Sequence, residues 1–244
     1  MVVAPSGISR DEMSTDLIEL GLRRDDVVLC HSSLSRIGHV DGGAAAVVAA
    51  LLDVVGYGGT LVTPAFTGAI TEPFTAGTPT TMGAIPTAVL AWPGRRRSPH
   101  PQASVAAVGL DAAPICERQP MAYALGPGSP FEEIVRRHGR ILLMGVGHNR
   151  SSMLHHSESK IANHRRKTRQ FPVRGDGQIS WVEVPDVGDD NDTFFPTVGA
   201  EFERRDLSVR SGFVGEANAV LFDADAYDRF AQRRLSELLQ NGGG

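Results

Sequence analysis

The chain has 244 residues and a formal net charge of -4, with 41% hydrophobic and 21% charged residues. This composition is typical of a globular protein, and the length suits one domain; we expect a single domain over residues 1–244 with an ordered core over about 9–239. The mild negative charge argues against a nucleic-acid binder with a broad basic surface. The sequence shows neither a signal peptide nor an apolar run of membrane-spanning length, so we expect a soluble cytoplasmic protein.

The first quarter of the chain predicts a strand–helix–strand unit that follows a capped helix. Ser9 and Glu12 have the spacing of a capping box, which predicts a helix start. The apolar runs 27–30 and 60–63 are typical of short buried strands, and an alanine- and valine-rich helix is expected between them, after residue 43. This order predicts that the two strands are parallel.

The middle of the chain alternates between irregular and regular segments. Residues 65–85 are rich in Thr, Gly and Pro, which predicts an irregular excursion. Strands are expected near 104–108 and 141–145, and helices near 131–138 and 153–161.

The C-terminal part predicts smaller antiparallel strands and a final helix. Beyond Phe171, apolar and polar residues alternate, and an acidic loop follows at 186–192. A helix is expected over 224–239, before a disordered glycine-rich tail. The fold class is therefore α/β (or α+β): one domain with a mostly parallel central sheet, flanking helices and an antiparallel C-terminal part.

His155 and Glu158 are candidates for proton transfer. They stand three residues apart on the expected helix, so they share one face, and a carboxylate beside an imidazole raises its basicity. The spacing alone equally fits a surface histidine with an incidental ion pair. A metal site with His156 is disfavoured because adjacent helical residues point about 100° apart and no His-Glu-x-x-His motif is present.

Three polar segments have both a functional and an ordinary interpretation. The turn 31–35 follows a buried strand and offers hydroxyls and backbone N–H groups to a cofactor, or is a simple capped turn. Arg97, with Ser98 and Ser104, can contact phosphate, or belong to a solvated loop. Acidic residues near 189–192 can attract a polycation, or be a solvated loop.

The chain resembles the aminoglycoside 3-N-acetyltransferase (antibiotic N-acetyltransferase) family. The matching segments occur in family order over almost the whole chain. They include Gly21-Leu22, Asp26-Val-Val-Leu-Cys-His-Ser-Ser-Leu-Ser-Arg-Ile-Gly38, Gly59-Thr-Leu-Val-Thr-Pro64, Gly83-Ala-Ile-Pro86, Arg97-Ser-Pro-His-Pro101, Ser104 to Gly109, Ser129-Pro130, Ile141-Leu-Leu-Met-Gly-Val-Gly147, Ser152-Met-Leu-His-His-Ser-Glu158 and Gly212 to Asp223.

The resemblance implies acetyl-coenzyme A as donor, a cationic aminoglycoside as acceptor, no metal, and a fold distinct from the commoner acetyltransferase superfamily. By position, His155 matches the family's catalytic histidine and Glu158 its orienting carboxylate. Ser152 stands where a hydroxyl stabilises the oxyanion or protonates the leaving thiolate. The remaining expected contacts are, for the cofactor, His31, Ser32, Ser33, Leu34, Ser35, Ile37, Gly38, Arg97, Ser98 and Ser104, and for the acceptor, Thr63, Phe66, Asp189, Asp190 and Asp192.

Two departures from the family pattern concern the acceptor. Thr87 replaces a Glu that is frequent in relatives, and the 66–80 region is compact. The alternatives are transfer to another aminoglycoside position or to a non-antibiotic amine, a serine hydrolase using Ser152 or Ser157, and a non-catalytic coenzyme A-binding protein. No Gly-x-Ser-x-Gly motif supports the hydrolase. Monomer and homodimer remain open.

Overall fold

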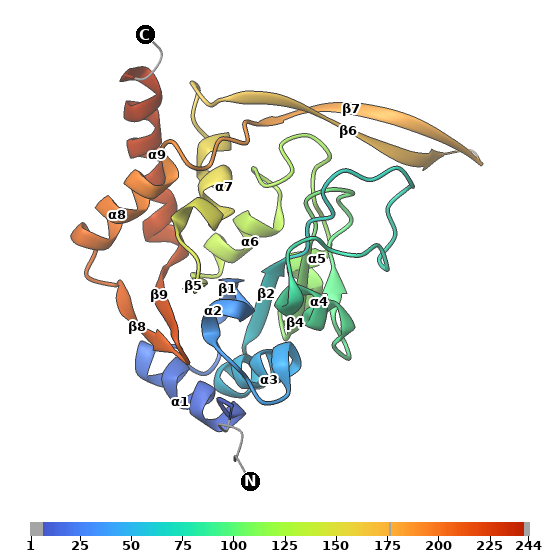
Figure 1. Cartoon of the computed structure of the whole chain (residues 1–244). Coiled ribbons are helices and arrows are strands. Elements are labelled where there is room, and N and C mark those ends of the chain that lie inside the picture. Colours follow the sequence, from blue (N-terminus) through green and yellow to red (C-terminus); the bar gives the residue numbers. More distant parts are fainter. Residues whose placement is uncertain (1–6, 176, 242–244) are drawn as a thin grey trace.

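The structure, a computed structural model, describes residues 7–175 and 177–241 (Figure 1). The strands are β1 (Val27–Ser32), β2 (Thr60–Pro64), β3 (Arg96–Arg97), β4 (Val105–Gly109), β5 (Arg140–Met144), β6 (Arg166–Gly175), β7 (Gln178–Val187), β8 (Arg210–Val214) and β9 (Ala217–Asp223). The helices are α1 (Arg10–Leu20), α2 (Leu34–Ile37), α3 (Gly43–Val55), α4 (Ala84–Ala91), α5 (Ala112–Cys116), α6 (Pro130–Arg136), α7 (Met153–Ser159), α8 (Phe195–Arg205) and α9 (Ala224–Asn241), with a 3₁₀ turn at His148–Arg150.

The central sheet has the strand order β3-β4-β2-β1-β5-β9-β8. Parallel pairing joins β1 to β2 and β1 to β5, as the strand–helix–strand order predicts. The outer pairings, β2 with β4 and β5 with β9 among them, are antiparallel. The predicted α/β class is confirmed, and the parallel pairing is concentrated in the middle of the sheet.

Two hydrophobic cores lie on opposite faces of this sheet. Successive strand residues alternate between them: Val28 and Cys30 of β1 belong to the core covered by α1, α3 and α4. Val27 and Leu29 belong to the core covered by α5 to α9. The sheet is therefore the middle of three layers, and its strands are apolar on both sides.

The capping box predicted for the first helix is present. Ser9 Oγ accepts from the backbone N–H of Glu12, the Glu12 carboxylate accepts from the N–H of Ser9, and the helix ends at the left-handed Gly21. Helix α8 is not anticipated by the sequence analysis. The glycine-rich tail predicted to be disordered falls largely outside the described residues.

Two segments extend away from the layered body. Residues 65–83 contain no helix or strand, which confirms the predicted excursion. Strands β6 and β7 form a two-stranded antiparallel hairpin that projects as a long arm (Figure 1). No helix within the described ranges is long and apolar enough to cross a membrane.

Both cysteines are buried, as expected. Burial raises the pKa of Cys30 and of Cys116 to about 12 in each case. Both thiols therefore remain protonated at neutral pH.

Candidate active site

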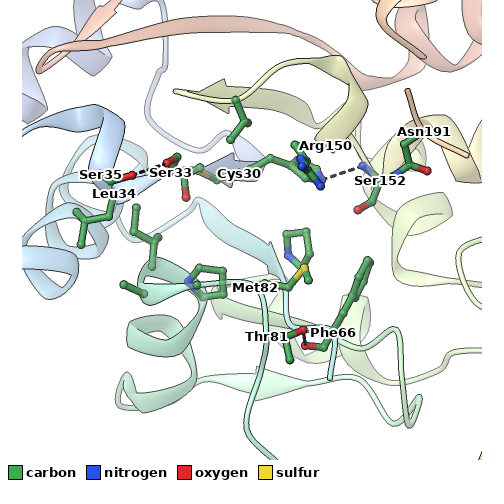
Figure 2. A pocket seen from close by; sticks show the side chains of 18 of the residues that line it. Cys30, Ser33, Leu34, Ser35, Phe66, Thr81, Met82, Arg150, Ser152 and Asn191 are labelled. Atoms are coloured by element: carbon green, nitrogen blue, oxygen red, sulfur yellow. Dashed lines mark hydrogen bonds between the residues drawn. The ribbon is translucent and has the colours of Figure 1, made fainter. Parts of the chain in front are cut away.

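A cavity of about 800 Å³ opens at the carboxyl ends of β1, β2 and β5. The chain leaves β1 toward α3 on one face of the sheet and leaves β5 toward α7 on the other, so the strand ends part and leave a crevice. Ser33 and Ser35 lie at one end of this cavity, and Ser152 and Asn191 lie at the opposite end (Figure 2). The cavity therefore extends from the turn after β1 to the start of α7.

His155 lines this cavity from the first turn of α7. Its ring packs edge-on against Phe195 of α8, with 4.9 Å between the ring centroids. Burial lowers the pKa of His155 to about 4, and the nearby Glu158 charge opposes this shift. The imidazole is therefore neutral, and able to accept a proton, throughout the neutral pH range.

Glu158 is fully buried on the same helix, but Arg165 binds its carboxylate. Arg165 donates from its backbone N to Oε1 (3.0 Å), from Nε to Oε1 (2.8 Å) and from Nη2 to Oε2 (2.8 Å). No hydrogen bond joins Glu158 to His155 in the part of the chain that the structure describes. The helix brings the predicted pair together, and in this geometry Glu158 acts on His155 through its charge.

His31 connects the end of β1 to the start of α7. Its Nε2 accepts a hydrogen bond from the backbone N–H of Ser152 at 3.0 Å, and its side chain is buried. Burial lowers the pKa of His31 to about 3, so the ring is neutral and carries its proton on Nδ1. His31, a predicted cofactor contact, thus also fixes the position of Ser152, the residue that precedes α7.

The turn after β1 places most of its predicted cofactor contacts along the cavity. These are Ser32, Ser33, Leu34, Ser35 and Gly38. The exception is Ile37, which is fully buried in the hydrophobic core and is not among the residues that line the cavity. Its side chain anchors the turn, and the prediction that it contacts a cofactor is not supported by this placement.

Ser32 offers a specific reason to expect a ligand at this turn. Its Oγ is buried and has no hydrogen-bond partner among the described residues. A buried hydroxyl without a partner costs about 1–3 kcal/mol, so a ligand atom that pairs with it would be favoured. The amide groups and thioester carbonyl of an acetyl-pantetheine chain supply such atoms.

Arg97, Ser98 and Ser104 do not line this cavity, and their role as cofactor contacts stays a prediction. Ser98 Oγ donates to Gln119 Oε1 at 2.6 Å and is fully buried. Ser104 Oγ donates to the carbonyl of Ala65 at 3.0 Å. These hydroxyls are already paired within the protein, which leaves little capacity for a phosphate.

Arg97 organises the 65–83 excursion. Its guanidinium donates to the carbonyl of Ala65 (2.8 Å) and to the carbonyl of Thr78, and it lies 4.7 Å from the centre of the Phe74 ring. Burial lowers the pKa of Arg97 to about 10. Arg97 therefore binds backbone carbonyls and an aromatic ring of the 65–83 segment with one cationic side chain.

The predicted acceptor contacts fall into two groups. Phe66 lines the cavity, whereas Thr63 is fully buried and absent from the lining. The acidic loop reaches the cavity through Asn191, and the three carboxylates predicted to contact the acceptor bind protein groups instead. Asp189 pairs with Lys167, Asp190 accepts from Thr193, and Asp192 accepts from Asn149.

The cavity also contains residues that the sequence analysis did not assign to the site. They are Cys30, Pro64, Thr81, Met82, the segment Gly83 to Pro86, Val146, Arg150 and Asn191. Gly83 to Pro86 carried a signal, because it is one of the segments that match the family. No group of three His, Cys, Asp or Glu side chains suited to a metal occurs within the described residues.

Comparison with known proteins gives concordant matches. The family model described as aminoglycoside 3-N-acetyltransferase matches residues 29–236. The chain is 34% identical to aminoglycoside N(3)-acetyltransferase IX of Micromonospora chalcea, covering 92% of each protein. It is 35% identical to aminoglycoside N(3)-acetyltransferase III of Serratia marcescens, covering 93% of this chain and 97% of that protein.

A solved structure shares the same fold. The structure of AAC-IIIb in a binary complex with CoASH superposes with a TM-score of 0.87 at 27% identity, covering 95% of this chain and 97% of that one. A protein of similar fold thus holds coenzyme A.

Proposed function

The chain belongs to the aminoglycoside 3-N-acetyltransferase family, and on this premise we propose that it transfers the acetyl group of acetyl-coenzyme A to an amino group of an aminoglycoside, with His155 as the general base. The observation that carries the proposal is the cavity that runs from the hydroxyl-rich turn after β1 to the neutral imidazole of His155. The 3-amino group is the acceptor that the names of the relatives indicate.

The donor fits the turn end of the cavity. Ser32 with its unpaired hydroxyl, Ser33 and Ser35 would hold the pantetheine chain, and the start of α4 would cover it. Acetyl-coenzyme A supplies an activated thioester there. The apolar side chains of Leu34 and Ile85 line the same cavity and exclude water from the thioester.

The acceptor would approach from the end of the cavity near α7. His155 receives the proton that the attacking nitrogen loses as the N–C bond forms and the C–S bond breaks. Coenzyme A leaves as the thiolate and takes up a proton, and the hydroxyl of Ser152, which lines the cavity beside His155, is placed to donate a hydrogen bond to the oxyanion or to the sulfur. Alignment of amine and thioester in one cavity supplies much of the remaining rate.

Glu158 supports the base by its charge. Its carboxylate stabilises the imidazolium that forms during transfer, although the direct partner of that carboxylate is Arg165. The hydrolase alternative with Ser157 is disfavoured. The Ser157 hydroxyl is buried, lies outside the cavity lining and donates to Asp228 at 2.8 Å.

The test is a thiol-release assay with purified protein, acetyl-coenzyme A and a panel of aminoglycosides. The panel contains scaffolds with and without a 3-amino group on deoxystreptamine, together with kasugamycin. The scaffolds that release no thiol show which amino group is required, and NMR of the product confirms the acetylated position. We expect release with scaffolds that carry the 3-amino group. Coenzyme A binding without release on any scaffold would contradict an aminoglycoside acceptor and leave another amine as the substrate.

A further inference from the structure

The charge of Glu158 has one strong partner. Its side chain is fully buried, and both oxygens accept from Arg165, whose side chain is 19% exposed. Burying a carboxylate is costly unless it is paired and hydrogen-bonded. The placement of the Glu158 carboxylate beside His155 therefore depends on Arg165.

Arg165 also supports the aromatic surface against which His155 packs. Its guanidinium carbon lies 5.5 Å from the centre of the Phe195 ring, and that ring contacts the imidazole edge-on. Arg165 thus contacts the two groups that surround the imidazole, an ionic one on α7 and an aromatic one on α8. A change at Arg165 would disturb both.

The same side chain reaches the acidic loop at the α7 end of the cavity. Arg165 Nη1 donates to the backbone carbonyl of Asp190, and it lies 3.7 Å from that residue's Oδ2. The next residue, Asn191, lines the cavity. Arg165 therefore links α7, which carries His155, to the loop beside the expected acceptor site.

We propose that Arg165 is a positioning residue of this enzyme: it holds the Glu158 carboxylate and the Phe195 ring in place around His155, and ties them to the loop at 189–192. This inference rests on the proposed function of His155 as the base. Arg165 touches neither the thioester nor the amine, and acts on the reaction only through His155.

The pH dependence of transfer separates this role from a purely structural one. The charged groups that face His155 are Glu158 on its own helix, Lys167 on β6, Asp186 on β7 and Asp189 in the acidic loop. With Arg165→Gln, the Glu158 carboxylate loses its forked partner and is free to pair directly with His155. Such an ion pair raises the pKa of the imidazole, so the acidic limb of the kcat profile moves to higher pH.

The experiment compares Arg165→Gln with Arg166→Gln, which removes the same charge from the adjacent, exposed residue. We expect Arg165→Gln to lower kcat about tenfold or more, with coenzyme A affinity unchanged, and to shift the acidic limb upward by about one pH unit. Arg166→Gln should do neither. The acceptor amine ionises in the same way with both variants, so a difference between their pH profiles reflects a group of the enzyme. Equal kcat and equal pH profiles for the two variants would overturn the inference.

A double mutant tests whether Arg165 acts through His155. In a His155→Asn background, Arg165→Gln should cause little further loss of kcat, whereas an independent, multiplicative loss would overturn the inference. If Arg165→Gln does not fold, Arg165→Lys takes its place, because lysine keeps the charge but not the forked contact with Glu158. A wild-type kcat and pH profile in a folded Arg165→Lys protein would also overturn it.

The proposed function can fail separately. Absence of transfer to any aminoglycoside would refute the proposed acceptor, and a His155→Asn protein with wild-type kcat would refute the base and Arg165 together. A large loss in His155→Asn beside an unaffected Arg165→Gln would refute the Arg165 inference alone.

Discussion

Two walls of the cavity are held in different ways. The wall formed by the turn after β1 and by α7 is tied to the central sheet, since Ser33 N donates to the carbonyl of Met144 and His31 accepts from Ser152 N. The opposite wall, residues 65–83, has no helix or strand. The side chain of Arg97 donates hydrogen bonds to its backbone carbonyls. The first wall is preorganised for one reaction, whereas the second can vary in shape with few changes to the core.

Among changes in the first wall, replacing His155, the proposed base, should lower kcat the most. We expect His155→Asn to lower kcat about 10²- to 10⁴-fold, because the attacking amine loses its proton acceptor. The dissociation constant of coenzyme A, measured by calorimetry, should stay within about twofold, since the turn after β1 is untouched. His39→Asn, an exposed change on another part of the surface, is the control and should keep the wild-type rate.

The link between β1 and α7 can be broken without touching the base. His31→Ala leaves the Ser152 N–H without its acceptor, which should lower the free energy of unfolding by about 1–3 kcal/mol and reduce kcat. Urea denaturation and steady-state kinetics measure the two effects. His31→Gln supplies a carbonyl acceptor and should recover part of both; equal losses in the two variants would argue that the ring's shape matters more than its hydrogen bond.

Acid should weaken the support of the second wall. His100 Nδ1 accepts from the N–H groups of Gln102 and Ala103, and burial lowers the pKa of His100 to about 4. Its folded pKa lies below the unfolded value of about 6.5, so this stabilisation is complete above pH 6.5 and declines as pH falls toward 4.

The size of this effect follows from linkage. At pH 5 the loss from His100 is about 2 kcal/mol relative to pH 8. A His100→Gln protein should therefore lose about 2 kcal/mol less of its unfolding free energy than the wild type over that interval, whatever its stability at pH 8. Identical slopes for the two proteins would contradict the assignment.

The smallest expected effect concerns the shape of the second wall. In Arg97→Lys, the lysine cannot bind the carbonyls of Ala65 and Thr78 together. The loss of one hydrogen bond should lower the free energy of unfolding by about 1 kcal/mol. Amide hydrogen exchange of residues 65–83 should accelerate, and the acceptor KM should rise up to about tenfold with kcat little changed. Unaltered exchange would show that Arg97 does not restrain the excursion.

The sequence predicted the elements whose signals are local. The Ser9 capping box, the apolar run of β1 and the His155–Glu158 spacing each depend on residues a few positions apart, and the structure contains all three elements. Helix α8 has such a signal in the spacing of Phe195, Val198 and Phe202 and in the proline of its first turn, and the sequence analysis missed it.

The site was less predictable because its contacts are not local. The Ser152–His31 hydrogen bond joins residues 121 positions apart, and nothing in either segment announces it. Ser98 and Ser104 have the residue type that binds phosphate, yet the fold turns both hydroxyls toward protein partners. Arg165 follows α7 within a basic run, where one partly buried arginine cannot be told from its exposed neighbours.

The burial of Cys30 and Cys116 has a practical consequence for experiments on this enzyme. A disulfide reagent such as that used to follow coenzyme A release reacts with thiolates. Both protein thiols are buried, and their pKa values are raised to about 12, so the thiolate form is scarce at neutral pH even for Cys30, which lines the cavity. The folded enzyme should therefore add almost no colour of its own. An unfolded variant should reveal two reactive thiols per chain at once, so the blank of each assay doubles as a count of misfolded protein.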